Sequence, residues 1–157
     1  MSAEDRLRQL GISLPQPPSP LASYLPYTTF MIGDSGPSLV FISGQLPLES
    51  GKVKYVGKLG RDVTVEEGIQ SARLCALNAL SVLRLAAGSL DSVKRILRVE
   101  GFVNSDPSFS EQAKVINGAS DLLVEVFGEK GRHSRLAVGV ASLPMNAATE
   151  VSVVALA

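Results

Sequence analysis

The chain has few of the side chains that most often bind metals or form covalent intermediates. Its 157 residues contain one Cys, one His and no Trp. The single Cys75 excludes an intrachain disulfide and a zinc site built from several cysteines of one chain. The single His133 excludes a metal site made of several histidines. With 5% aromatic residues, the chain also has few rings that could stack on single-stranded nucleic acid.

The charges are balanced, and no long apolar run is present. Fifteen basic residues face fifteen acidic ones, so the chain has no overall attraction to nucleic acid or to an anionic membrane surface. No segment approaches the ~18 apolar residues of a membrane span, and the charged N-terminus lacks the apolar core of a signal peptide. These features favour a cytoplasmic protein with neither nucleic-acid nor membrane partners.

The length predicts one domain over residues 1–157, at ~100–200 residues per domain. Residues 1–20 are interpreted as an N-terminal arm. A short helix is expected over residues 1–11, ended by Gly11. Four prolines between positions 15 and 20 then favour an extended path over the surface.

The hydrophobic pattern predicts an α+β domain of two layers, with two helices on one face of a mixed sheet. Each helix begins with a capping-box pattern, Thr64 to Glu67 in the first and Ser108 to Glu111 in the second. Each ends at a glycine, Gly88 and Gly128. The expected strands are 28–32, 39–43, 93–103, 135–141 and 149–156, with a further short strand before the first helix.

The second face of this sheet is expected to remain apolar. Residues 39–42 form a continuous apolar run, which is typical of a strand covered on both faces. The last strand also carries apolar residues that no third layer would cover. A bare apolar face of this size favours self-association. The alternative is that the proline-rich arm covers the face.

A few polar residues occupy positions that suggest a site. Ser43, Gly44 and Gln45 end a buried strand, where backbone N–H groups can contact a ligand. Arg135 begins an apolar strand, and Glu150 lies near the start of the last one. Structural roles remain the alternative for each, as an edge charge or a solvated side chain.

Three further residues have a structural role as their simplest interpretation. Asn117 interrupts the apolar stripe of the second helix and would point to water. His133 lies in a predicted loop and is expected to be exposed and uninvolved. Cys75 is expected to be an inert core residue, because a free Cys usually behaves as a small buried hydrophobe.

Taken together, these residues resemble the RidA/YjgF family of reactive-intermediate deaminases. The resemblance rests on the segments 43–47 (SGQLP) and 99–104 (VEGFVN), on Arg135 followed by Leu143-Pro144, and on Glu150. It runs from about Pro20 to Ala157.

The resemblance implies a chorismate-mutase-like fold and a homotrimer with three clefts between subunits. It also implies a reaction in which water attacks a small 2-imino acid or its enamine, releasing ammonia and a 2-keto acid. No metal or organic cofactor is implied.

The resemblance also assigns roles to individual residues. Arg135 matches the residue that binds the substrate carboxylate, and Glu150 matches the acidic residue that handles a proton or positions water. Backbone N–H groups around Gly44, between Ser43 and Gln45, would complete the anion pocket. Tyr24 matches a residue at the rim, and Asn117 matches a helical Asn that lines the cleft.

The separation of Arg135 and Glu150 predicts a site shared between chains. If their strands paired as a hairpin about Pro144 or Met145, the two side chains would lie ~13 Å apart along a strand. A shared site would be contradicted by a structure in which both residues converge within one chain.

The chain also departs from compact members of the family. It is longer by the arm and by the loop 128–133, and Ala137 and Ser152 stand where many members have a cysteine and an acidic residue. The carboxylate pocket is therefore a firmer expectation than rapid imine hydrolysis. A non-catalytic trimer that binds small carboxylates for regulation is the alternative, and endoribonuclease activity has less support because the charge is balanced and only one His is present.

Overall fold

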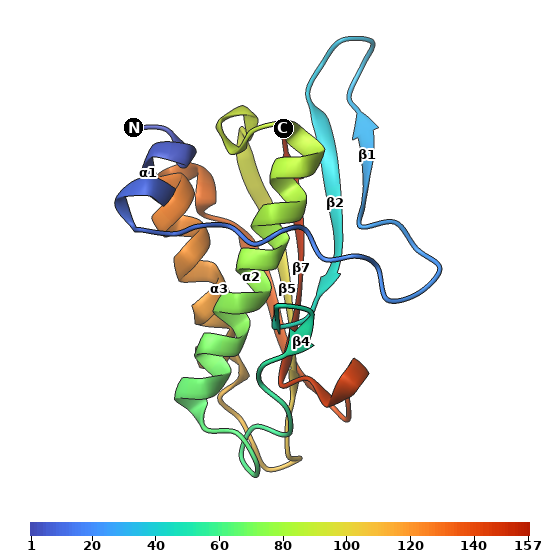
Figure 1. Cartoon of the computed structure of the whole chain (residues 1–157), viewed down its shortest axis with the longest axis vertical. Helices are drawn as coiled ribbons and strands as arrows, with labels where there is room; N and C mark the ends of the chain where they lie inside the picture. Colours follow the sequence, from blue (N-terminus) through green and yellow to red (C-terminus); the bar gives the residue numbers. More distant parts are fainter.

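The computed structural model describes all 157 residues, and it contains one five-stranded sheet with two long helices on one face (Figure 1). A two-stranded hairpin follows β2, and a short helix lies at the N-terminus. The helices are α1 (Ala3–Gln9), α2 (Val65–Ala87) and α3 (Gln112–Phe127); the strands are β1 (Tyr27–Met31), β2 (Ser38–Gln45), β3 (Leu48–Glu49), β4 (Lys52–Val53), β5 (Arg95–Asn104), β6 (Ser134–Val140) and β7 (Thr149–Leu156).

The strand order is β1-β2-β7-β5-β6, and only β5 and β6 run parallel. The hairpin pairing of β6 with β7, on which the ~13 Å separation was conditional, does not occur, because β5 lies between the two strands. The physical reason is α3, which carries the chain back along the sheet after β5. Strand β6 then pairs in parallel with β5 as the second strand of a crossover unit.

The two helix starts behave differently from one another. At α2 the capping box is confirmed, since the Thr64 hydroxyl accepts from the Glu67 N–H at 3.2 Å and the Glu67 carboxylate accepts from the Thr64 N–H at 2.8 Å. At α3 the predicted box is wrong, because the helix begins at Gln112 with no side-chain cap. The N–H and hydroxyl of Ser108 instead donate to Asp106 Oδ1 in a turn.

The core lies between the helices and the sheet. The α2 side chains Cys75, Leu80 and Leu83 and the α3 side chain Ile116 are all fully buried there. Burial raises the pKa of the Cys75 thiol to about 12, so the expectation of an inert core cysteine is confirmed. None of the helices combines the length and apolarity needed to cross a membrane.

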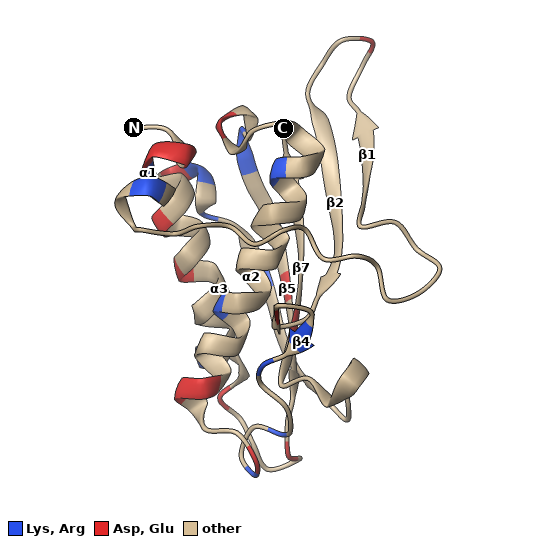
Figure 2. Ribbon diagram, viewed as in Figure 1, with Lys and Arg blue, Asp and Glu red and all other residues tan.

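The other face of the sheet is uncovered within one chain. Val40 and Ile42 are buried under the helices, whereas Phe41 between them is 44% exposed. The expectation that the run 39–42 is covered on both faces is therefore wrong for the single chain. Phe30 is also exposed, and in Figure 2 the ribbon of β1 and β2 carries no charge apart from the turn between them.

The N-terminal arm does not cover this face. In Figure 1 it crosses the outer side of α2 before it reaches the β1 edge. The Ser81 hydroxyl of α2 donates to the Pro15 carbonyl at 2.8 Å, which ties the arm to the helix layer. The alternative explanation of the apolar face is thus wrong, and the face remains available for another chain.

Candidate functional site

A cleft of about 720 Å³ lies where β2 ends and β7 begins. Pro18, near the end of the arm, and Leu21, just after the arm, form one wall of the cleft. Met145 lines the cleft from the loop before β7. Five of the residues singled out from the sequence line this cleft: Tyr24, Ser43, Gly44, Gln45 and Glu150.

A β-bulge at the end of β2 shapes the floor of the cleft. Ile42 pairs with Val153 and Gln45 with Val151, so β2 has one more residue here than β7. The Gln45 amide donates to the Ser43 carbonyl at 2.9 Å, and the Ser43 hydroxyl donates to the Leu25 carbonyl at 2.6 Å. The polar groups of Ser43 and Gln45 therefore brace the bulge.

Gly44 allows the carboxylate of Glu150 to lie directly against the β2 backbone. A Cβ atom at position 44 would overlap Glu150 Oε1 and would lie 3.0 Å from its carboxyl carbon. Glu150 is half-buried, and this burial raises the pKa of its carboxyl group above the ordinary value. Glu150 is thus held in a position where it can accept or donate a proton in the cleft.

Tyr24 connects the arm to the rim of the cleft. Its hydroxyl accepts a hydrogen bond from the Leu21 N–H at 3.3 Å, and its ring remains 45% exposed. The arm therefore turns back on itself at the mouth of the cleft. Leu21, which the turn carries, is also exposed.

The loop before β7 has a backbone conformation that few residues other than glycine adopt. Met145 and Asn146 have φ values of 56° and 54°, in the left-handed region that disfavours side chains other than Gly and Asn. Such conformations persist only where the surroundings hold them, and they occur often at ligand sites. The Gly57 N–H donates to the Asn146 carbonyl at 2.8 Å and so holds this loop in place.

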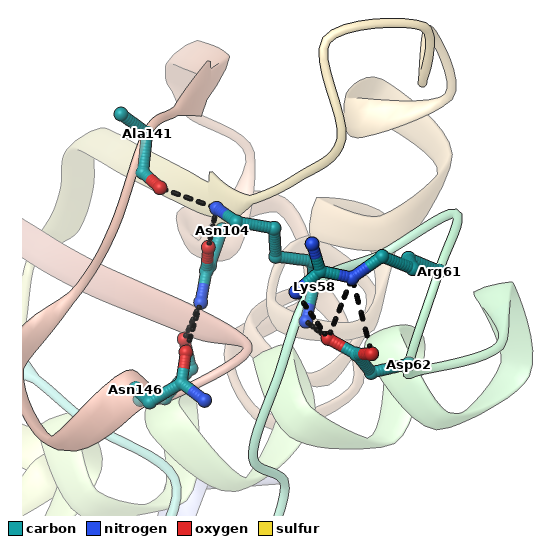
Figure 3. A network of polar contacts seen from close by, with 7 residues as sticks. Lys58, Arg61, Asp62, Asn104, Ala141 and Asn146 are labelled. Carbon is teal, nitrogen blue, oxygen red and sulfur yellow. Dashed lines mark hydrogen bonds and ion pairs between the residues drawn. The ribbon is translucent and has the colours of Figure 1, made fainter.

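Asn104, a buried residue at the end of β5, anchors the same loop (Figure 3). The Asn104 amide donates to Asn146 Oδ1 at 3.0 Å and to the Ala147 carbonyl at 3.1 Å. Asn104 Oδ1 accepts from Lys58 Nζ at 2.7 Å, and the same ammonium group donates to the Ala141 carbonyl. Both ends of the loop between β6 and β7 are thereby tied to β5.

We expect Asn104→Ala to lower the free energy of unfolding by about 2 kcal/mol, because it leaves the Ala147 carbonyl without its partner and removes one of the two acceptors of the Lys58 ammonium group. Urea unfolding monitored by circular dichroism measures the change. Asn146→Gly is the matched control, since it removes one bond of the same network but suits the positive φ. An equal loss in both variants would contradict the anchoring role of Asn104.

Arg135 and Asn117 lie together at a different place, on the side of the sheet that carries α3. Arg135 Nη1 donates to Asn117 Oδ1 at 2.8 Å and to the Ser120 hydroxyl at 3.2 Å. Arg135 Nη2 donates to the Ala113 carbonyl at 3.0 Å. The interpretation of Asn117 as a side chain that points only to water is therefore wrong. The guanidinium group is held by α3 and remains partly exposed.

Arg135 and Glu150 do not meet within one chain. Arg135 of β6 pairs in register with Val99 of β5. Glu150 of β7, on the other side of β5, pairs in register with Phe102. Two strand spacings and three residues separate them, on the order of 14 Å. Because Val99 and Phe102 are an odd number of residues apart, Arg135 and Glu150 also point to opposite faces.

His133 is another departure from the sequence interpretation. It is half-buried rather than exposed and uninvolved, with its Nε2 atom 2.9 Å from the Ser120 hydroxyl. Ser120 was not singled out from the sequence. Its position three residues after Asn117, on the same face of α3, is the signal that points to it.

No three His, Cys, Asp or Glu side chains lie close enough together to hold a metal ion. The polar groups of the cleft and of the Arg135 cluster are instead a carboxylate, a guanidinium group, hydroxyls and amides. These groups suit the recognition of a small charged organic molecule and proton transfer to it.

Comparisons with known proteins agree with the fold. Protein TCP17 of Trypanosoma cruzi is 49% identical over 146 residues, which make up 92% of this chain and 88% of that protein. A Shewanella oneidensis MR-1 protein described as a putative endoribonuclease is 41% identical, with a TM-score of 0.91 over 99% of both chains. E. coli TdcF, solved with bound serine, shares the fold at 24% identity, with a TM-score of 0.63 over 90% of this chain and 94% of its own.

A family model described as YjgF/chorismate mutase-like, putative endoribonuclease, matches residues 4–156. The match covers nearly the whole chain, and the expected α+β chorismate-mutase-like fold is confirmed by the Shewanella structure. The chain therefore belongs to the YjgF/chorismate mutase-like family, which includes the RidA proteins.

Proposed function

We propose that this protein hydrolyses small 2-imino acids and their enamine tautomers to 2-keto acids and ammonia. The observation that carries the proposal is the half-buried Glu150 carboxylate. It lines a cleft of about 720 Å³, and the absence of a Cβ atom at Gly44 leaves the space that it occupies. The serine bound to TdcF supports a small carboxylate as the kind of ligand, because a 2-imino acid is similar in size and charge.

In the proposed reaction, the Arg135 guanidinium group binds the substrate carboxylate through two parallel hydrogen bonds. The substrate reacts as its nitrogen-protonated iminium form, C=NH₂⁺. Glu150 accepts a proton from a water molecule as the water oxygen forms a bond to the iminium carbon, and the π electrons of the C=N bond move to nitrogen. The resulting carbinolamine carries both OH and NH₂ on that carbon. Glu150 then donates its proton to the amine. As the C–N bond breaks and the C=O bond forms, the hydroxyl proton returns to Glu150, and ammonia leaves with a 2-keto acid as the second product.

The proposed site needs more than one copy of the chain. Arg135 and Glu150 are separated by β5 and point to opposite faces, so a substrate of a few atoms cannot contact both in one chain. A homotrimer would bury the exposed Phe30 and Phe41 and would bring the Arg135 cluster of one subunit to the cleft of the next.

Two other functions use the same residues differently. A regulatory trimer would bind a small carboxylate through Arg135 without turnover. An endoribonuclease is suggested by the description of the family, but it would need a basic groove and an acid–base pair. The balanced charge and a lone His133 that lies beside Arg135, away from the cleft, make this the weaker alternative.

The test is a coupled assay on the full chain. A threonine dehydratase generates 2-iminobutanoate, and semicarbazide traps the imine as an absorbing semicarbazone. If the protein hydrolyses the imine, it lowers the rate of trapping in proportion to its concentration. Light scattering during size-exclusion chromatography measures the number of subunits in the same sample.

The outcomes separate the three functions. A folded trimer that leaves the trapping rate unchanged but binds 2-oxobutanoate would favour the regulatory alternative. Cleavage of an RNA substrate that disappears in Arg135→Ala would favour the endoribonuclease. A monomer that is fully active would contradict the shared site.

A further inference from the structure

A hydrogen-bond chain leads from Arg135 to the only histidine of the protein. Arg135 Nη1 donates to the Ser120 hydroxyl at 3.2 Å, and the Ser120 oxygen lies 2.9 Å from His133 Nε2. His133 Nδ1 lies 2.6 Å from the Gly131 carbonyl. Each member comes from a different element, because Arg135 lies on β6, Ser120 on α3 and Gly131 at the end of the 3₁₀ turn before β6.

The hydrogen bonds of this series can be donated in only one direction. A carbonyl oxygen accepts hydrogen bonds and never donates them, so His133 carries its proton on Nδ1. In the neutral ring Nε2 is then an acceptor, and the Ser120 hydroxyl donates its proton to it. The Ser120 oxygen is left to accept from Arg135, which is the role that a guanidinium group requires.

We propose that His133 and Ser120 are positioning residues that orient the Arg135 guanidinium group for the substrate carboxylate. The inference rests on the proposed function. Ser120 fixes one terminal nitrogen of the guanidinium group in addition to Asn117, and His133 fixes the direction in which the Ser120 hydroxyl points. The guanidinium edge that these bonds leave free is presented to the ligand.

Protonation of His133 disrupts this arrangement of donors and acceptors. An imidazolium ring donates from both nitrogens, so the Ser120 hydroxyl would face two donors and could no longer donate to the ring. The new positive charge would also lie close to Arg135. The groups that act on the pKa of His133 are its burial, the Gly131 carbonyl and Arg135, and none of them is a carboxylate that would offset the new charge. Ser120 of α3 is neutral, and Glu129 of the 3₁₀ turn is paired with Arg132 at 2.8 Å.

The neutral ring is favoured by its surroundings. Burial lowers the pKa of His133 below its ordinary value of 6.5, and the charge of Arg135 lowers it further, whereas the hydrogen bond to Gly131 opposes this shift. The hydrogen-bond chain is therefore intact at neutral pH, and it is disrupted only when the pH falls through this lowered pKa.

The experiment measures binding of 2-oxobutanoate, a stable carboxylate of the product class, to the full chain by calorimetry. At pH 7.5 we expect His133→Ala and Ser120→Ala to weaken binding about 3- to 10-fold, the effect of one lost neutral hydrogen bond. Ser120→Thr keeps the hydroxyl and His133→Gln offers a side-chain acceptor, so both are expected to bind as the wild type does.

The pH dependence separates a positioning role from a packing role. In wild type, affinity is expected to fall as the pH is lowered from 7.5 through the lowered pKa of His133, while the probe carboxyl stays ionised. In His133→Gln, which does not titrate, this fall is expected to be absent. The comparison between the two proteins removes any contribution from Glu150, since both contain it.

The failure of this inference can be told apart from the failure of the proposed function. If wild type binds the probe and Arg135→Ala does not, but His133→Ala and Ser120→Ala bind as wild type, only the positioning role is overturned. If wild type and Arg135→Ala bind equally or not at all, Arg135 is not the carboxylate binder and the proposed function fails. Parallel pH profiles for wild type and His133→Gln would also overturn the positioning role.

Discussion

Replacing Arg135 by alanine is expected to lower kcat/KM for 2-iminobutanoate hydrolysis by about 100- to 10,000-fold. The physical reason is the loss of two charge-assisted hydrogen bonds to the substrate carboxylate, at about 1.5–3 kcal/mol each. Most of the effect is expected in KM, because the carboxylate is bound in the ground state and in the transition state alike. The semicarbazide competition assay measures both parameters.

Two matched variants make the Arg135 result specific. Arg135→Lys keeps the charge but loses the planar fork, so it is expected to recover only a small part of the activity. Arg132→Ala removes an exposed arginine three residues away that pairs with Glu129, and it is expected to leave activity unchanged. Equal activity in wild type and Arg135→Ala would exclude Arg135 from substrate binding.

The substitution Glu150→Gln is expected to lower kcat by about 100-fold or more and to leave KM nearly unchanged. Glutamine has almost the same shape but cannot accept a proton from water, and general acid–base catalysis contributes about 100- to 10,000-fold. Wild-type kcat, measured at saturating substrate, is expected to rise with pH as Glu150 ionises, with a midpoint above the ordinary pKa of 4.5. The Glu150→Gln variant is expected to lack this ascending limb.

As the pH rises, the contribution of Glu150 to stability is expected to fall while kcat rises. Because burial raises the pKa of Glu150, this residue is protonated to a greater extent in the folded chain than in the unfolded chain. Its contribution to stability is present below the ordinary value of 4.5 and is lost as the pH rises through the raised pKa of the folded chain. At pH 7 the Glu150→Gln variant is expected to melt no lower than wild type.

A control variant separates the loss of Glu150 from a general loss of negative charge. Glu66→Gln removes an exposed carboxylate in the first turn of α2, and its kcat and pH profile are expected to match wild type. A Glu150→Gln variant with wild-type kcat would exclude Glu150 as the proton carrier. The assay and thermal unfolding followed by circular dichroism provide the two readouts.

Local patterns were sufficient to predict most of the elements, and the family resemblance identified the residues of the cleft. The capping box at Thr64 and the apolar stripes of both helices depend on neighbours within a few residues, so they can be recognised in the sequence. The segment 43–45, Tyr24 and Glu150 were singled out as site residues, and all of them line one cleft. The start of α3 was misplaced because Asp106 competes with Glu111 for Ser108.

Other features depend on contacts between distant residues, and no local pattern contains them. The neighbour of β7 is β5 rather than β6, because α3 returns the chain in parallel to β5. Asn104 holds the loop before β7 through residues more than 40 positions away, and Lys58 is equally distant from it in sequence. Asn104 ends the segment 99–104 that carries the family resemblance, but nothing in that segment indicates which residues it contacts, and Lys58 belongs to no short motif.

The sequence by itself determined the composition of the two layers, the family to which the chain belongs and the identity of the charged residues in the candidate site. Only the tertiary structure decided that Arg135 and Glu150 lie on opposite faces, that the arm crosses α2, and that His133 contacts Ser120. The reason is that burial patterns and caps arise from residues close together in the chain. Strand order and side-chain partners instead depend on how the helices pack across the sheet.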